Sequence, residues 1–476
     1  MSGKITGLII LLIANGFCGF SQNQREQTSK EPVEVVLTPY KTTLLANGKD
    51  EATIKVMLVN KQGEEVKNAN NEVHFLISGP AKVIRIYRDL GKGEIAKIPF
   101  ENAKDPAFKG SCTIILQSTQ TPGAIKIKAT SKGLWDGGTD IITVNPNQKI
   151  NTSNDPYLFS KLNIHSTAKL QGKILGADIS FLPQLESRGM KFSDKEVQKE
   201  VIRILKDHGF NYIRLRLFVD PSNDSGYSPG KGFCDLPHTL EMAKRIKKEG
   251  MKFLLDFHYS DTWADPGKQF KPNAWKGLDF RDLSKKVFDY TTDVLEALKA
   301  QGTLPDMVQT GNEINHGIIW PQGNVQHLDS LAILLNAAMA AVKKVDPSII
   351  TLLHIALGGQ NAESEFFIDN MISRGVSFDV IGESYYPKWH GTLQDLETNL
   401  DLLHKKYHKP VIVAEYSQLK KEVNKIAFSI PGNQIKGTFI WEPLNTWEAV
   451  FDKDGKSNYY LNDYDEIKRQ FLKNQN

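Results

Sequence analysis

DKEVQKEVIRILKDHGFNYIRLRLF, residues 194–218, joins a helical pattern to a strand pattern within one short stretch. In its first part the apolar residues recur at helical spacing, and Gly209 follows as a residue type that commonly ends a helix. The run at 212–218 then alternates apolar and charged side chains, as a strand does. A helix that leads directly into a strand predicts an α/β architecture.

The same alternation continues from Lys169 to the C-terminus. The amphipathic stretch at 238–250 again ends on a glycine before a strand-like run. Eight strands that alternate with helices predict a (β/α)₈ TIM barrel, and a doubly wound sheet is the alternative. We favour the barrel because no glycine-rich phosphate turn follows the first strand. The strand-like runs are residues 174–180, 212–218, 252–258, 306–313, 350–356, 379–386, 410–416 and 437–443.

Residues 33–144 have the sequence pattern of an all-β domain. Short runs such as VEVVLTPY and ATIKVMLVN are separated by turn signals such as ANGKD and NKQGEE, which predicts a β-sandwich. The stretches LLANGKDEATIKVMLVNKQGEEV and FKGSCTIILQSTQTPGAIKIKATSKGL resemble bacterial immunoglobulin-like modules. Trp135 is the single tryptophan of this sandwich and a weak platform for sugar stacking, so we expect a spacer, and a sandwich that itself binds glycan is the alternative.

The first twenty residues predict the compartment. A lysine, a short apolar stretch and small residues form a secretory signal peptide over residues 1–20, too short to span a membrane. Residues 21–32 are expected to be an extended tether, and residues 145–168 a linker rich in Asn, Ser and Pro. We therefore expect a bacterial extracellular, cell-surface or periplasmic protein. Cys18 is a candidate for lipid attachment, the one membrane contact expected.

Composition excludes several classes of partner and cofactor. The chain has 476 residues, 40% of them hydrophobic, and a net charge of only +4, which does not suggest nucleic-acid binding. Cys112 and Cys234 fall in different predicted domains, so neither a disulfide nor a cysteine zinc site is expected. We expect a monomer that requires no cofactor.

Two apolar runs carry a glutamate at or near their carboxyl end. VQTGNE (308–313) and VIVAEY (411–416) look like strands buried on both faces, where a carboxylate has to be held by partners or used in chemistry. In a TIM barrel the active site lies at the carboxyl ends of the strands. Strands four and seven lie across the barrel mouth, so Glu313 and Glu415 are predicted to meet there.

Other polar residues share this position at or near predicted strand ends. Any one of them could be structural, but the whole set has no good structural explanation because buried charge is costly unless paired. Six of the seven tryptophans also follow position 260, at or beyond strand ends, where their rings could stack on sugar. The polar segment at 258–275 is expected to form one wall of a cleft. The predicted substrate-binding residues are Asp178, Arg214, Arg216, Asp256, His258, Trp263, Asp265, Asn312, His354, Tyr386 and Trp441.

This pattern fits glycoside hydrolysis with retention, which uses two carboxyl groups about 5 Å apart. One acts as acid/base and needs a raised pKa, whereas the other acts as nucleophile and stays ionised. Arg214 or Arg216 could lower the pKa of the nucleophile. Asn312 could hydrogen-bond the sugar 2-hydroxyl. A catalytic metal is not expected, because His258 and His354 are isolated rather than clustered.

Four stretches carry a specific resemblance: GADISFLPQLESRGMKF, LLDFHYSDTWADPGKQFKPNAW, VQTGNEINHGIIWP and DVIGESYYP. Together they resemble the endo-β-1,4-galactanases of glycoside hydrolase family 53, from about Lys169 to the C-terminus. The resemblance implies a (β/α)₈ enzyme that hydrolyses the β-1,4-galactan side chains of pectin with retention. It implies that Glu313 is the acid/base and Glu415 the nucleophile. It also places Asn312, Arg214, His258 and Trp441 around the cleaved sugar.

This sequence differs from the family in one loop. Bacterial members can hold a structural calcium after the eighth strand, and here that region is short. Asp452 and Asp454 are weak calcium candidates, since two acids beside a glycine are usually an ordinary turn. Two other functions remain open: another retaining endo-β-glycanase, such as a mannanase or xylanase, and a non-catalytic galactan-binding protein.

Overall fold

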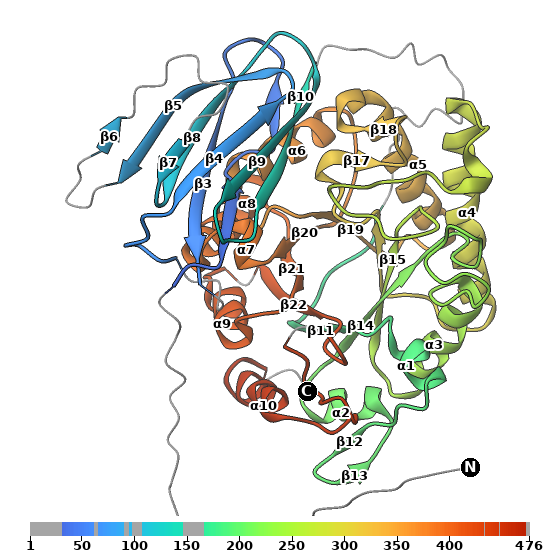
Figure 1. Ribbon diagram of the computed structural model, residues 1–476. Coiled ribbons are helices and arrows are strands. Elements are labelled where there is room, and N and C mark those ends of the chain that lie inside the picture. The colour runs from blue at the N-terminus through green and yellow to red at the C-terminus, as the bar shows by residue number, and fades with distance from the viewer. Residues whose placement is uncertain are drawn as a thin grey trace, which may run out of the picture.

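The computed structural model describes residues 31–60, 65–89, 95–97, 107–145, 166–432, 434–446 and 448–472. The expected signal peptide with Cys18, most of the tether and most of the linker lie outside the described residues. Figure 1 shows two parts: a pair of β-sheets, blue to teal, and a barrel surrounded by helices, green to red.

The N-terminal part is a β-sandwich of two five-stranded sheets, in the orders β1-β3-β8-β5-β6 and β2-β10-β9-β4-β7. Side chains along β3 and β8 are buried at every second position, as expected for strands with one face in a core. The predicted immunoglobulin-like sandwich is therefore confirmed. Its strands are β1 (Glu34–Pro39), β2 (Thr43–Leu45), β3 (Glu51–Val59), β4 (Glu72–Ser78), β5 (Ala81–Asp89), β6 (Ile95–Lys97), β7 (Ala107–Lys109), β8 (Cys112–Ser118), β9 (Gly123–Ser131) and β10 (Gly137–Val144).

The C-terminal part is a closed barrel of eight parallel strands, which confirms the predicted (β/α)₈ fold. Every predicted strand-like run holds one barrel strand, although the ends shift by a few residues. The strands are β11 (Ile174–Asp178), β14 (Tyr212–Leu217), β15 (Lys252–Phe257), β16 (Met307–Thr310), β19 (Ile350–Ile355), β20 (Val380–Tyr385), β21 (Val411–Tyr416) and β22 (Ile435–Trp441).

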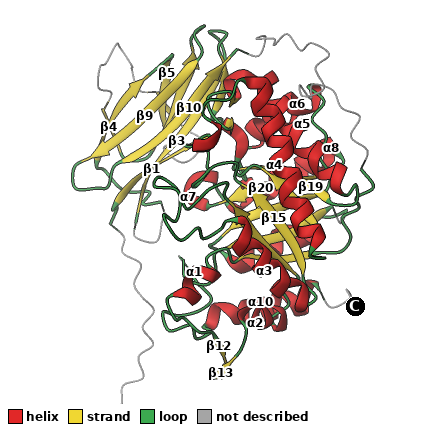
Figure 2. Cartoon of the chain, turned by 90° about the vertical axis from the view of Figure 1, so that its right-hand side faces the viewer, coloured by secondary structure: helices red, strands yellow, loops and turns green. Residues whose placement is uncertain are grey.

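Helices cover the outside of the barrel (Figure 2). The helix expected from residue 194 begins only at Val201, because the residues before it form the small β12–β13 hairpin. The helices are α1 (Leu182–Ser187), α2 (Val201–Asp207), α3 (Leu236–Lys248), α4 (Phe280–Ala300), α5 (Leu328–Val345), α6 (Asn361–Ser373), α7 (Pro387–His390), α8 (Leu393–Tyr407), α9 (Lys420–Ser429) and α10 (Tyr459–Phe471). Short elements in the loops are β12 (Ser193–Asp194), β13 (Val197–Gln198), β17 (Gly317–Ile318), β18 (Gly323–Asn324), η1 (Asn273–Trp275), η2 (Ile314–His316) and η3 (Val325–His327).

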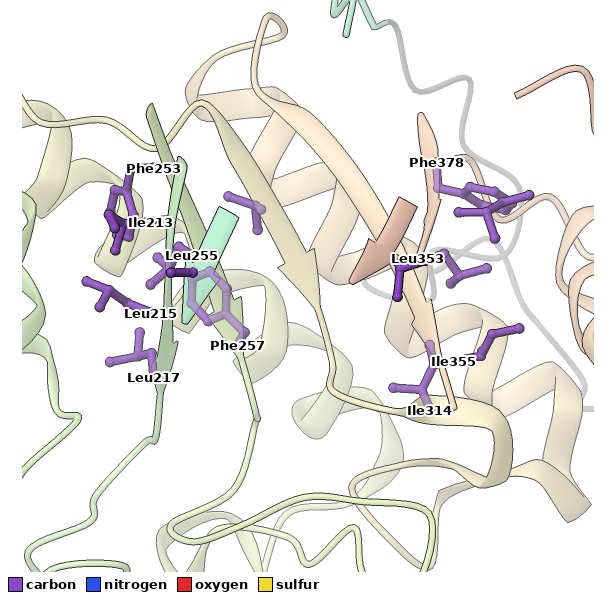
Figure 3. Packing of buried hydrophobic residues seen from close by; sticks show 14 of the residues in the cluster. Ile213, Leu215, Leu217, Phe253, Leu255, Phe257, Ile314, Leu353, Ile355 and Phe378 are labelled. Atoms are coloured by element: carbon purple, nitrogen blue, oxygen red, sulfur yellow. The ribbon is translucent and has the colours of Figure 1, made fainter. Parts of the chain in front are cut away.

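The inside of the barrel is layered along the strands. Near the strand amino ends the inward side chains, such as Tyr212, are apolar or aromatic and form their own buried cluster. One alternation further along β14, the same face carries Arg214 and then Arg216. The outward side chains, among them Ile213 and Leu215, pack toward the helices (Figure 3). The strand period therefore places both arginines inside the barrel.

The sandwich packs directly on the barrel. The backbone N–H groups of Thr42 and Thr43 donate to one carboxylate oxygen of Glu363 on α6, at 2.9 and 2.8 Å. Ile142 and Val144 of β10 belong to the same apolar cluster as the outer face of the barrel. Figure 1 shows the sandwich beside α7 on one side of the barrel. These contacts fix the sandwich to the barrel, and its role as a spacer stays a prediction.

Candidate active site

The carboxyl ends of the barrel strands open into a cleft of about 500 Å³. Barrel residues form most of its wall, and a segment of the sandwich forms the rest. The residues predicted for catalysis or substrate binding line this cleft, with the exception of Asp256 and His354. The predicted residues in its lining are Asp178, Arg214, Arg216, His258, Trp263, Asp265, Asn312, Glu313, Tyr386, Glu415 and Trp441.

Glu313 and Glu415 come together in the cleft, with a carboxylate oxygen of each within 4.8 Å of the other. Glu415 lies on β21, as expected. The strand β16 ends at Thr310, so Asn312 and Glu313 lie in the loop beyond it rather than in the strand. Glu313 has a φ of 50°, a left-handed conformation that is uncommon for residues with a side chain and that clusters at functional sites.

Arg214 is almost completely buried and connects the acidic residues of the site. Its NH1 group donates to Asp178 Oδ2 at 2.9 Å and to Glu415 Oε2 at 3.0 Å. Its NH2 group donates to Asp256 Oδ2 and Asn312 Oδ1, both at 2.8 Å. These partners compensate for the cost of burying the guanidinium. They also fix the orientation of Asn312, whose amide oxygen points to the arginine.

Two donors hold the carboxylate of Glu415. Arg214 contacts Oε2, and the hydroxyl of Tyr386 donates to Oε1 at 2.7 Å. Burial raises the pKa of Glu415, whereas the charge of Arg214 and the hydrogen bond from Tyr386 oppose that rise. Burial and the charge of Glu415 raise the pKa of Tyr386, which keeps its hydroxyl protonated. The ionised form of Glu415 is therefore the one that satisfies both donors.

Glu313 lies in a different environment. The hydroxyl of Ser384 donates to its Oε1 at 2.7 Å. Burial, and next the negative charge of Glu415, raise the pKa of Glu313 well above its usual range. With one proton shared between two neighbouring carboxyls, the donors at Glu415 favour the state in which Glu313 carries it. Because Oε1 accepts from Ser384, the other oxygen, Oε2, is left for the acid proton.

Asp256 and His354 do not bind substrate as predicted. Neither has exposed surface, and both lie beneath the cleft. Asp256 Oδ1 accepts from the amide of Gln309 at 2.6 Å, and His354 Nδ1 contacts the same amide nitrogen at 3.0 Å. His354 Nε2 lies 2.9 Å from the hydroxyl of Ser384. Burial, and next the charge of Arg214, lower the pKa of His354 well below its usual range, so the ring is neutral. Both residues hold other site residues in place.

His258 lines the cleft, but its ring nitrogens are both occupied. Nδ1 accepts from the backbone N–H of Ala264 at 3.1 Å, so Nε2 carries the proton and donates to Asp256 at 3.1 Å. The ring can therefore contact a substrate in the cleft only through its carbon atoms and not through a hydrogen bond.

The two arginines of β14 have separate partners. Arg214 contacts Glu415, whereas Arg216 forms an ion pair with Glu442. The guanidinium of Arg216 also lies against the rings of Phe181 and Trp263, at 4.4 and 4.3 Å from their centroids. Of the two arginines considered for the nucleophile, the structure selects Arg214. Arg216 instead supports the aromatic wall.

Three polar residues of the site, two glutamines and one serine, were not predicted from the sequence. Gln309 lies at the centre of the network beneath the cleft, and Ser384 contacts Glu313. Gln269 donates to the backbone carbonyl of Asn312 at 2.8 Å and so ties the wall segment to the catalytic loop. Gln309 could have been found, since it is a polar residue in the middle of a buried run.

The aromatic lining is smaller than the tryptophan pattern suggested. Trp263, Trp389 and Trp441 line the cleft. Trp275 is 1% exposed and belongs to the core, and Trp320 lines a separate hollow. Trp447 lies outside the described residues. The segment at 258–275 does supply one wall, through His258 and residues 263–267.

The calcium candidates do not fit a cation site. Asp452 Oδ1 accepts from the backbone N–H groups of Asp454 and Lys456, both at 2.9 Å, which is an ordinary turn. The carboxylate of Asp454 lies 3.5 Å from the ammonium group of Lys453, with which it forms an exposed ion pair.

Known sequences and structures resemble both parts of the chain. The family model described as "Glycosyl hydrolase family 53" matches residues 174–425, and that described as "Glycoside hydrolase family 2 C-terminal domain 5" matches residues 35–139. A Niallia circulans protein named "Uncharacterized protein in bgaB 5'region" is 45% identical over 256 residues, which are 52% of this chain and 68% of that protein. The "Probable arabinogalactan endo-beta-1,4-galactanase A" of Aspergillus terreus is 34% identical over 311 residues, 58% of this chain and 86% of that one.

A solved structure of a family 53 catalytic domain also matches the barrel. "Ignisphaera aggregans GH53 catalytic domain" has a TM-score of 0.59 and 34% sequence identity, and the match covers 64% of this chain and 98% of that one. The matched part of this chain is large enough to contain the whole barrel.

Proposed function

The chain belongs to glycosyl hydrolase family 53, and we propose that it is an endo-β-1,4-galactanase that acts with retention of configuration. The observation that carries the proposal is the carboxylate pair, whose oxygens lie within 4.8 Å. Retaining enzymes hold their carboxyls about 5 Å apart, whereas inverting enzymes leave about 6.5–9.5 Å for a water molecule. A non-catalytic galactan-binding protein would not need this pair.

In the first step Glu313 is the acid and Glu415 the nucleophile. Glu313 gives its Oε2 proton to the glycosidic oxygen while a carboxylate oxygen of Glu415 attacks the anomeric carbon. The bond between that carbon and the glycosidic oxygen breaks, and a galactosyl ester of Glu415 forms. Arg214 holds the amide oxygen of Asn312, whose amide nitrogen donates to the backbone carbonyl of Ala264 at 2.8 Å. The second N–H of that nitrogen can donate to the sugar 2-hydroxyl.

In the second step Glu313 becomes the base. Esterification removes the negative charge of Glu415, which was the second-largest cause of the raised pKa of Glu313. The pKa of Glu313 therefore falls, and its carboxylate can take a proton from the water that attacks the anomeric carbon. The ester bond breaks, Glu415 leaves as a carboxylate, and the product keeps its configuration.

The substrate we propose is the β-1,4-galactan side chain of pectin, cleaved internally to galacto-oligosaccharides. An open cleft with Trp263, Trp389 and Trp441 in its lining suits a polymer that stacks sugar faces on aromatic rings. The N-terminal pattern supports secretion, with Cys18 as a candidate lipid anchor. We propose that the secreted enzyme is a monomer.

Product analysis on galactan, arabinogalactan, mannan and xylan tests the proposal. We expect internal cleavage of galactan, and NMR of the first product should show the β anomer. Preferred cleavage of mannan or xylan would contradict the substrate, and an α-anomeric first product would contradict the mechanism.

A further inference from the structure

The sandwich contributes to the wall of the catalytic cleft. Gly138, Thr139 and Asp140, at the start of β10, line it together with Pro39 and Thr42. No role in substrate binding follows from the barrel fold for residues of this separate domain.

This part of the sandwich is held firmly in place. Gln360 of the barrel donates to the backbone carbonyl of Pro39 at 2.7 Å. His316, in η2 directly after the catalytic loop, lies 3.3 Å from the hydroxyl of Thr42. Lys388 of α7 forms an ion pair with Glu34 of β1 at 2.5 Å. The barrel therefore holds the sandwich wall in place through several side-chain contacts.

The same three residues of β10 border a second hollow, on the sandwich itself. Lys126 and Lys128 of β9 and Leu76 of β4 line this hollow together with residues 138–140. The strand register puts Asp140 beside Lys126 and Gly138 beside Lys128, so their side-chain positions share one face of the sheet. Because the catalytic cleft and this hollow share residues 138–140, a sugar chain that passes over β10 would follow a path from one to the other.

The chemistry along this path suits a sugar chain. Trp389 on α7 is 45% exposed and lines the cleft, and α7 packs against β1 of the sandwich. Asp140 is exposed, and Thr139 is partly exposed. An aromatic face beside carboxylate and hydroxyl groups is the combination that recognises the two sides of a sugar ring.

We propose that Trp389 and the start of β10 form a distal sugar-binding site, which extends the galactan path from the barrel onto the sandwich. This inference rests on the proposed galactanase function and names the sandwich as part of its substrate-binding surface. It predicts that the enzyme prefers long galactan chains over short ones because only long chains reach β10.

Two single variants test the site: Asp140→Ala and Trp389→Ala. Each is compared with a matched control on the sandwich that lines neither hollow. Glu72→Ala removes an exposed carboxylate of β4, and Trp135→Ala removes a ring that is 79% exposed. Removal of the whole sandwich is unsuitable because Ile142 and Val144 pack in the barrel cluster.

The readout is steady-state kinetics on polymeric β-1,4-galactan and on β-1,4-galactotriose, with thermal unfolding as a check on folding. We expect KM for the polymer to rise about three- to tenfold in each test variant, as for loss of about 0.5–1.5 kcal/mol of contact. The kinetics of Asp140→Ala on galactotriose should match the wild type, and so should both control variants on both substrates.

Three outcomes overturn the reasoning at different points. An unchanged KM for the polymer in both test variants refutes the distal site and leaves the galactanase function intact. A loss on galactotriose in Asp140→Ala that equals its loss on the polymer shows that β10 closes the cleft near the cleaved bond, which also refutes a distal site. A wild-type enzyme that cleaves neither substrate refutes the proposed function, and it also refutes β-1,4-galactan as the ligand of the distal site.

Discussion

Replacing Tyr386 by phenylalanine is the sharpest test of the roles given to the two glutamates. The hydroxyl of Tyr386 donates to Glu415 Oε1 at 2.7 Å, and phenylalanine removes it while the ring stays in place. Since this hydrogen bond favours ionised Glu415, its loss raises the pKa of Glu415. The proton shared by the pair then moves from Glu313 toward Glu415, which is the unproductive state.

The size of the effect follows from the contact. A hydrogen bond to a buried charged group contributes about 1.5–3 kcal/mol, and one pKa unit corresponds to about 1.4 kcal/mol. Arg214 still holds Oε2, so relaxation of the site takes up part of the loss. We expect the acid limb of the kcat/KM profile on galactan to move up by about one pH unit.

Tyr385→Phe is the matched control. The neighbouring hydroxyl of Tyr385 donates to the backbone carbonyl of Gly391 at 3.2 Å and does not contact either glutamate. This variant should lose a little stability and keep the wild-type acid limb. If the acid limb of Tyr386→Phe coincides with that of the wild type, Glu415 is not the group whose ionised form drives the reaction.

Three further predictions concern the acid, the arginine and the domain contact. Glu313→Gln should lower kcat on galactan by about 10²–10⁴-fold and retain more activity on an aryl galactoside, whose leaving group needs little protonation; equal losses on both would contradict the acid role. Arg214→Lys should reduce kcat strongly and lower Tm, because lysine cannot keep the paired contacts to Glu415 and its other partners. An unchanged kcat and Tm would contradict the role of Arg214 in connecting the acidic residues. Burial raises the pKa of Glu363 to about 7, so in the pH range from its ordinary value of 4.5 to about 7 the folded state binds more protons than the unfolded state and stability falls as pH rises. Glu363→Gln should remove this component from the Tm–pH curve, and an identical slope would refute it.

Much of the fold was readable from local patterns. Apolar runs that alternate with amphipathic helices predicted the closed barrel, and the alternation in β14 placed Arg214 and Arg216 inside it. Strand ends are informative in this fold because all parallel strands finish at the same mouth. This is why Glu313 and Glu415, roughly a hundred residues apart in the chain, could be paired from sequence.

The local patterns were less reliable for residues just below the mouth. Asp256 and His354 lie near strand ends, as the cleft residues do. They lie deeper in the barrel, however, and have no exposed surface. A strand pattern gives the face on which a side chain lies and not its height in the barrel, since height depends on the stagger between neighbouring strands. Their role in holding Gln309 and Ser384 therefore became visible only in the fold.

The sequence by itself determined the architecture, the family and the two carboxylates, because strand period, helix stops and short motifs are local properties of the chain. Only the tertiary structure decided which arginine holds Glu415 and which residues lie beneath the cleft. It also brought β10 of the sandwich to the cleft wall, although the expected linker, residues 145–168, separates the two domains in the chain. Contacts of this kind depend on the relative placement of distant elements, which no local pattern encodes.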